Sequence, residues 1–105
     1  MNFVEELNDD NYNEFINREI SLVDVWATFC GPCKQLMPTI EELSIEYKDR
    51  VSIGKLEGTQ NKNTVTELGV RSIPAIFLYK NGEIVDRSTG MTSKENLKQM
   101  IEKHL

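Results

Sequence analysis

The sequence has 105 residues and a mass of 12.1 kDa, which is the size of one domain with a hydrophobic core. Its 39% hydrophobic and 28% charged residues are typical of a folded globular protein. The net charge of −5 without a basic patch argues against nucleic-acid binding, and no apolar run approaches the ~18 residues of a membrane span. Residues 1–6 also lack the pattern of a signal peptide. We therefore expect one domain over residues 1–105, in the cytoplasm and away from membranes.

Short helical and strand patterns alternate along the chain. In order, they predict an edge strand over 3–5, a helix capped by Asn8 or Asp9, a strand over Ser21–Ala27, a helix from Cys33 with Pro38 inside it, a strand over Val51–Leu56, a helix over Asn61–Leu68, strands over Ala75–Tyr79 and Glu83–Ser88, and a final helix. The Asn81-Gly82 pair between the last two strands is a strong hairpin signal. Alternation followed by a hairpin predicts an α/β fold with a mixed sheet and helices on both faces.

Two of these elements have further features. The strand over Ser21–Ala27 is apolar on both faces except at Asp24, as expected of a central strand. The final helix follows a capping-box pattern over Thr92–Glu95. Its predicted buried residues are Leu97, Met100, Ile101 and Leu105.

The only two cysteines form a Cys30-Gly31-Pro32-Cys33 motif between the central strand and the next helix. Sulfurs at i and i+3 of a helix start can form a disulfide, and the helix N-terminus stabilises a thiolate. Pro32 suits the first helical turn, and Gly31 leaves Cys30 open to a bulky disulfide. The motif predicts two-step thiol–disulfide exchange, in which Cys30 attacks a substrate disulfide and Cys33 resolves the mixed disulfide.

Half of a zinc site is the alternative interpretation of this motif. Zinc usually takes four ligands, and the only histidine is His104, at the other end of the chain. We expect His104 to be a solvated helix-terminal residue without a catalytic role, and we assign no metal or other cofactor to the chain.

Asp24 is the second candidate for chemistry. An unpaired carboxylate in an apolar strand is costly to bury, so burial would raise its pKa. An acid near the end of the strand that leads to the cysteines could exchange protons with Cys33. The alternative is an edge-strand aspartate that faces water.

Other residues are uninformative on pattern alone. Pro74 opens a strand, and base rates favour a trans peptide bond before it. Trp26 is most simply a core residue, whereas Phe29 and Met91 could be ordinary exposed apolar side chains.

The segment Asp24–Lys34 resembles the active-site segment of the thioredoxin family. The similarity continues over essentially the whole chain, through Pro38, Lys55-Leu56, Gly69–Pro74, Phe77–Gly82 and Gly90. The resemblance implies a five-stranded mixed sheet flanked by four helices. It also implies a monomeric protein-disulfide reductase that acts on disulfide-containing client proteins and is recycled by thioredoxin reductase.

The resemblance also implies residue roles. Cys30 would be the nucleophile, Cys33 the resolving thiol and Asp24 a buried acid whose charge is adjusted by Lys55. The Ile73–Pro74 peptide would be cis, and the backbone at Ile73 would bind an extended substrate like an added strand. The implied docking residues are Trp26, Phe29, Gly31, Pro32, Ile73, Pro74, Gly90 and Met91.

Two departures from the family pattern stand near this site. Phe29 replaces the usual tryptophan and removes an indole N–H donor. Residues 57–60 replace a segment that usually carries an apolar residue and then aspartate, so Gly58 adds flexibility and the hydrogen bonds that fix this loop in the family are in question. Thr59 could still cap the next helix.

Several other functions fit parts of the sequence. A glutaredoxin-like enzyme, an oxidase or an isomerase would have another dipeptide between the cysteines. A binding subunit with incidental cysteines would show no activity alone, and a metal-transfer protein would retain metal after purification under reducing conditions.

Overall fold

The computed structural model describes residues 1–105 and contains a five-stranded sheet in the order β1-β3-β2-β4-β5. The elements are β1 (Glu5–Leu7), α1 (Tyr12–Ile16), β2 (Ile20–Trp26), α2 (Gly31–Glu46), β3 (Ser52–Glu57), the 3-10 helix η1 (Gly58–Gln60), α3 (Lys62–Leu68), β4 (Ala75–Lys80), β5 (Glu83–Thr89) and α4 (Lys94–Glu102). No helix combines the length and the apolar character needed to cross a bilayer.

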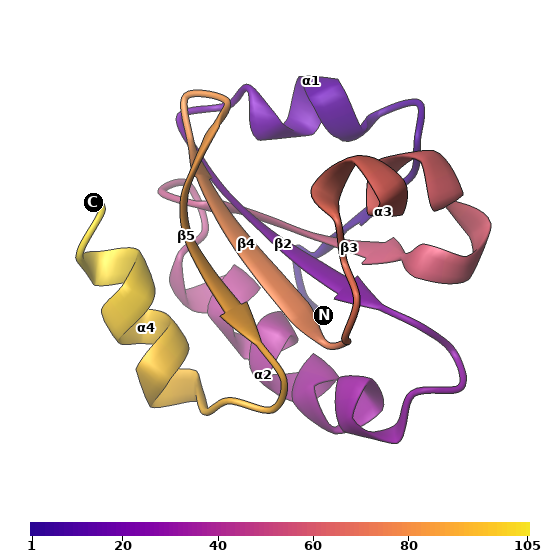
Figure 1. Ribbon diagram of the computed structural model, residues 1–105. Helices are drawn as coiled ribbons and strands as arrows, with labels where there is room; N and C mark the ends of the chain where they lie inside the picture. The colour runs from indigo at the N-terminus through magenta and orange to yellow at the C-terminus, as the bar shows by residue number, and fades with distance from the viewer.

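The central strand of the sheet is β2, as its apolar pattern predicts. It pairs in parallel with β3 and antiparallel with β4, while β1 and β5 form the two edges. The register places Asp24 between Lys55 of β3 and Ile76 of β4. The predicted α/β fold with a mixed sheet is therefore confirmed (Figure 1).

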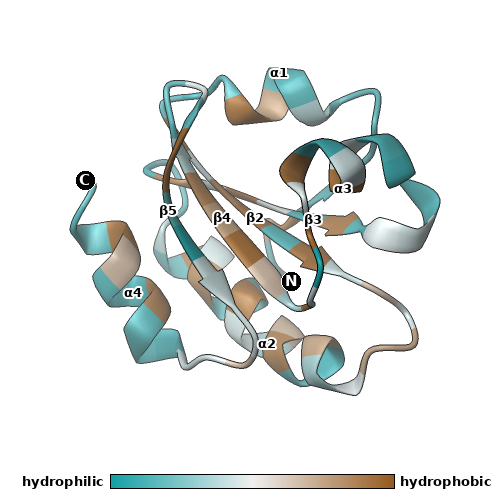
Figure 2. Ribbon diagram, in the orientation of Figure 1, coloured by the Kyte–Doolittle hydropathy of each residue, from teal (hydrophilic) through white to brown (hydrophobic).

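Helices cover both faces of the sheet. Buried side chains of α2 and α4 pack with β2 and β4 on one face, and those of α1 pack with the other, where α3 also lies (Figure 1). Figure 2 shows hydrophobic residues along the central strands, between these helical layers. This two-sided burial explains why β2 has no polar face.

The N-terminus of α2 carries the cysteine motif. Cys30 has extended backbone dihedrals and is the N-cap, and the helix begins at Gly31, two residues before the predicted start. Pro32 lies in the first turn, where its missing N–H costs no hydrogen bond, and Pro38 lies inside the helix as predicted.

Several other predicted boundaries also differ from the structure. The edge strand is Glu5–Leu7 rather than 3–5. The cap of α4 is Ser93, whose side chain accepts the Asn96 N–H at 3.1 Å, and not Thr92. Because α4 ends at Glu102, Leu105 lies beyond it and is 48% exposed instead of buried.

The two candidate caps of the first helix have different roles. The Asn8 side chain accepts the N–H groups of Asp10 and Asn11, each at 2.8 Å, in the turn that precedes α1. The Asp9 carboxylate instead accepts both the N–H and the hydroxyl of Thr64, at 3.0 and 2.6 Å, at the start of α3. A cap expected for one helix thus serves another.

Candidate active site

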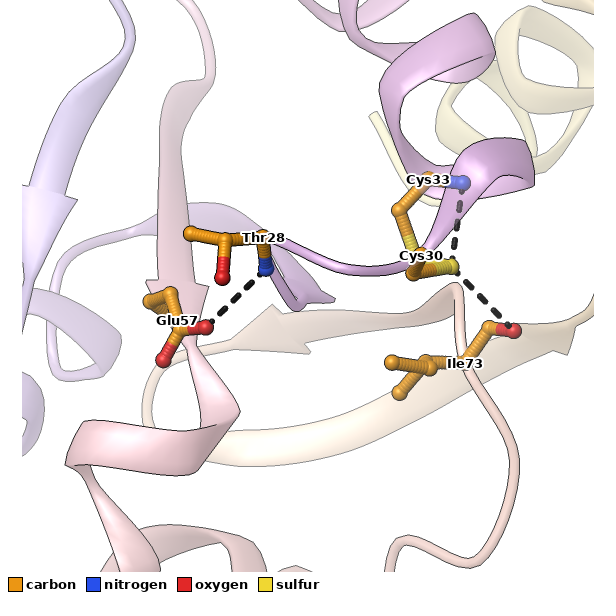
Figure 3. Close-up of a disulfide and its surroundings, with 5 residues drawn as sticks. All are labelled: Thr28, Cys30, Cys33, Glu57 and Ile73. Carbon is orange, nitrogen blue, oxygen red and sulfur yellow. Dashed lines mark hydrogen bonds between the residues drawn. A yellow bond between two sulfur atoms is a disulfide. The ribbon is translucent and has the colours of Figure 1, made fainter.

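The two cysteines form a disulfide at the junction of β2 and α2 (Figure 3). Their Cα atoms lie 5.3 Å apart, within the usual range for this bond. Cys30 is 8% exposed to solvent, whereas Cys33 is completely buried. Of the two sulfurs, that of Cys30 is therefore the one that a large substrate can reach.

Polar backbone groups surround the sulfur of Cys30. The Cys33 N–H donates to Cys30 Sγ at 3.2 Å, and the Ile73 carbonyl oxygen lies 4.0 Å from the same sulfur (Figure 3). A donor at the helix N-terminus stabilises negative charge, so this position favours a thiolate once the disulfide is reduced.

Asp24 is completely buried, and neither carboxylate oxygen has a hydrogen-bond partner. Burial raises the pKa of Asp24 to about 7, and the positive charge of Lys55 limits that rise. On β2, Asp24 points to the same side as Leu22, which packs in the cluster that includes α2. The aspartate that faces water, the alternative considered from sequence, is therefore excluded.

Lys55 and Trp26 lie close to this acid. Lys55 Nζ is 5.6 Å from the centre of the Trp26 ring, and the Trp26 indole N–H is buried without a partner. The structure thus places Asp24, Lys55 and Trp26 together at one end of the paired strands β2 and β3.

A second loop lies beside the disulfide. The Ile73–Pro74 peptide is cis, as the family resemblance implies, and the Gly90 N–H donates to the Pro74 carbonyl at 2.8 Å. Gly90 has φ of +87°, a conformation that favours glycine. The next residue, Met91, is 52% exposed.

An apolar groove of about 320 Å³ adjoins the disulfide. Among the predicted docking residues, it is lined by Trp26, Phe29 and Ile73. Phe29 is 76% exposed at its rim. Gly31, Pro32, Pro74, Gly90 and Met91 do not line this groove, and Gly31 has open space where a side chain would project.

Glu57, the last residue of β3, was not among the site residues predicted from sequence. Its carboxylate accepts the Thr28 N–H at 3.1 Å (Figure 3), and it also accepts the Gln60 N–H at 3.1 Å and the Thr59 hydroxyl at 2.7 Å. The loop is therefore held by hydrogen bonds, despite the changed sequence at 57–60. Thr59 does not cap α3, whose N-cap position is Asn61, and its hydroxyl instead donates to Glu57. Glu57 caps η1 instead, and the only local sequence signal of that cap was an acidic residue three positions before Gln60.

His104 lies far along the chain from the cysteines and contacts Asp86. Its Nε2 is 3.2 Å from Asp86 Oδ2, and its side chain is only 24% exposed, so the expected solvated position was wrong. No group of three or more His, Cys, Asp or Glu side chains is arranged to hold a metal ion.

Comparison with known proteins supports the interpretation of this geometry. The thioredoxin family model matches residues 3–103. Thioredoxin of Staphylococcus saprophyticus is 43% identical, over 95% of this chain and 96% of its own length. Thioredoxins of Staphylococcus haemolyticus and Staphylococcus aureus are 42% and 38% identical over the same shares. The chain therefore belongs to the thioredoxin family of protein-disulfide oxidoreductases.

Proposed function

We propose that Cys30 is the nucleophile and Cys33 the resolving thiol of a protein-disulfide reductase. Family membership and the paired cysteines support disulfide reduction by thiol–disulfide exchange. The observation that carries the assignment of roles is the difference in burial, since Cys30 Sγ is at the surface end of the pair and Cys33 is completely enclosed.

The exchange takes place in two steps. In the reduced protein, the Cys30 thiolate attacks one sulfur of the client disulfide, and the other client sulfur leaves as a thiolate that takes up a proton. Cys33 then loses its proton and attacks Cys30 Sγ, which breaks the mixed disulfide and releases the second client thiolate. The client gains two electrons and two protons, and the Cys30–Cys33 disulfide forms.

Asp24 is the proposed proton acceptor for Cys33. A group with a pKa of about 7 can take up and release a proton at neutral pH, which is the range that this role requires. Lys55 favours the charged form of Asp24 and so keeps that pKa from rising further. Both residues act at the resolving step rather than at the first attack.

The proposed docking surface surrounds Cys30. Its residues are Trp26, Phe29, Gly31, Pro32, Ile73, Pro74, Gly90 and Met91. The exposed Phe29 ring and the groove support this role, because they offer an apolar surface on one side of the reachable sulfur, whereas Pro74 is itself buried. An extended client segment would pair with the backbone at Ile73.

The wider context of the reaction is also proposed. Residues 1–105 act as one domain and as a monomer in the cytoplasm. Thioredoxin reductase supplies the two electrons that return the Cys30–Cys33 disulfide to the dithiol, and client proteins that carry disulfides consume them.

Trapping of mixed disulfides tests the two cysteine roles. The Cys33→Ser variant should retain client proteins as covalent complexes that dithiothreitol releases, because nothing resolves the bond to Cys30. The Cys30→Ser variant should capture none, since the remaining thiol is buried. Non-reducing gel electrophoresis after incubation with a disulfide-containing protein measures both, and equal trapping by the two variants would refute the roles.

A further inference from the structure

Glu57 joins two segments on either side of the groove beside the disulfide. We propose that it is a positioning residue for client binding, which fixes the loop that carries Cys30 against the segment that forms another wall of the groove. This inference rests on the proposed function, because it assigns the groove to protein clients.

The first segment is the connection between β2 and α2. The Cys30 N–H donates to the Ala27 carbonyl at 3.1 Å, which closes one turn of this loop. Within the same loop, the Thr28 N–H donates to Glu57 Oε2 at 3.1 Å. Because Glu57 pairs with Trp26, the last residue of β2, its side chain lies next to the loop that follows β2.

The second segment is η1. The other carboxylate oxygen, Glu57 Oε1, caps it by accepting the Gln60 N–H and the Thr59 hydroxyl. This short helix contributes Gly58 and Thr59 to the groove, while the first loop contributes Phe29. One carboxylate therefore sets the distance between two walls that a client side chain would enter.

Both oxygens of Glu57 are acceptors, and this requires a carboxylate. A glutamine has one carbonyl oxygen and one NH2 group. In either orientation of this amide, the NH2 group would face the N–H or O–H donors of one of the two segments and could not accept a hydrogen bond from them. Burial alone would raise the pKa of Glu57, but its hydrogen bonds outweigh that effect and hold the pKa below the ordinary value. The side chain is therefore ionised at neutral pH and can hold both segments.

Protein disulfides and small disulfides should differ in their dependence on Glu57. A small disulfide needs only the sulfur of Cys30, whose surroundings of helix N-terminus and Ile73 carbonyl do not include Glu57. A protein client must also fit the groove. Loss of the carboxylate should therefore weaken binding of a protein disulfide and leave the reaction with a small disulfide nearly unchanged.

Steady-state reduction of insulin and of glutathione disulfide by the Glu57→Gln variant tests this separation. We expect KM for insulin to rise about tenfold, the effect of losing one charge-assisted hydrogen bond, and the rate with glutathione disulfide to stay within about twofold. Glu95→Gln is the matched control, since Glu95 is exposed on α4 and makes no ion pair or side-chain hydrogen bond. Equal losses with both substrates, or no loss with insulin, would overturn the proposal.

A measurement on the unmodified protein covers the case in which the variant does not fold. The NMR shift of the Thr28 amide proton should move as Glu57 is protonated, with a midpoint below the ordinary glutamate pKa. The nearby charged groups are Glu6, which lines an adjacent hollow, Lys55, on the same strand, and Arg71, which lines the groove. Burial raises the pKa of Asp24 to about 7. A Thr28 amide shift that does not change in acid, or whose midpoint matches the pKa of Asp24, would refute the hydrogen bond from Thr28 to Glu57.

The two tests separate this inference from the proposed function. Failure of the unmodified protein to reduce insulin would refute the proposed function. The acid titration of the Thr28 amide would still report whether Glu57 holds the loop.

Discussion

Replacement of the buried acid, Asp24→Asn, should make the protein more stable by an amount that depends on pH. Neither carboxylate oxygen accepts a hydrogen bond, so the asparagine loses no partner. It also carries no charge to desolvate. The same substitution should slow protein-disulfide reduction at neutral pH, because Cys33 loses its proposed proton acceptor.

The size of the effect follows from the raised pKa. The carboxyl titrates at 3.8 ordinarily and at about 7 in the folded protein. Between these pH values the unfolded chain has released a proton that the folded protein still binds, so the free energy of unfolding of the wild type falls as pH rises. At roughly 1.4 kcal/mol for each pH unit, the total loss is about 4 kcal/mol and is complete above pH 7. The gain from Asp24→Asn should therefore be small at pH 4 and about 4 kcal/mol at pH 8.

Urea unfolding of both oxidised proteins between pH 4 and pH 8.5 measures this difference. Asp10→Asn is the matched control, because Asp10 is exposed and makes no side-chain hydrogen bond or ion pair, so its effect should not vary with pH in the same way. A constant difference between Asp24→Asn and wild type across this range would refute the burial argument. Unchanged exchange rates between pH 6 and 9 would refute the proton-acceptor role.

Single contacts elsewhere in the molecule lead to three further predictions. Lys55→Met should raise the pKa of Asp24 above 7, since it removes the charge that lowers it; carboxyl-carbon NMR would contradict this if the midpoint stayed or fell. Gly58→Ala should stabilise the fold by about 0.5 kcal/mol, because the new methyl group meets only ordinary contacts at 3.4 Å or more. Gly54→Ala should instead destabilise the fold by about 1–3 kcal/mol, because its methyl group would come within 2.8 Å of the buried side chain of Leu7. Similar urea midpoints for the two variants would show that these steric contacts do not control stability. Ser93→Ala should cost about 1 kcal/mol through the lost cap of α4, and an unchanged unfolding free energy would show that this bond contributes nothing.

Features with a local cause were predictable from sequence. The apolar run around Asp24 is long enough to require burial on both faces, and two cysteines three residues apart at a helix start are close in any such helix. The fold class followed from the same short-range patterns. The cis peptide before Pro74 was implied by the family resemblance, and no local pattern of residues would have indicated it.

Features that depend on the pairing of distant segments were not predictable. The bond from Thr28 to Glu57 exists because β2 and β3 pair in one register, and a register is not visible in either strand alone. The position of Leu105 depended on where α4 ends. Thr92 and Ser93 are both favourable N-cap residues, so the sequence could not distinguish two helix starts that differ by one residue.

The bonds between Asp9 and Thr64 have a consequence for the order in which the molecule assembles. With seven residues, α3 is too short to be stable as an isolated helix, and the N–H of Thr64, in its first turn, finds its acceptor 55 residues earlier in the chain. The Asp9 N–H donates in return to Asn61 Oδ1 at 3.0 Å, so the two segments hold each other. We therefore expect α3 to become ordered only once the segment before α1 has docked. We expect any cut or mutation that releases that segment to disorder α3 and, with it, the neighbouring apolar groove, which Val65 of α3 helps to line.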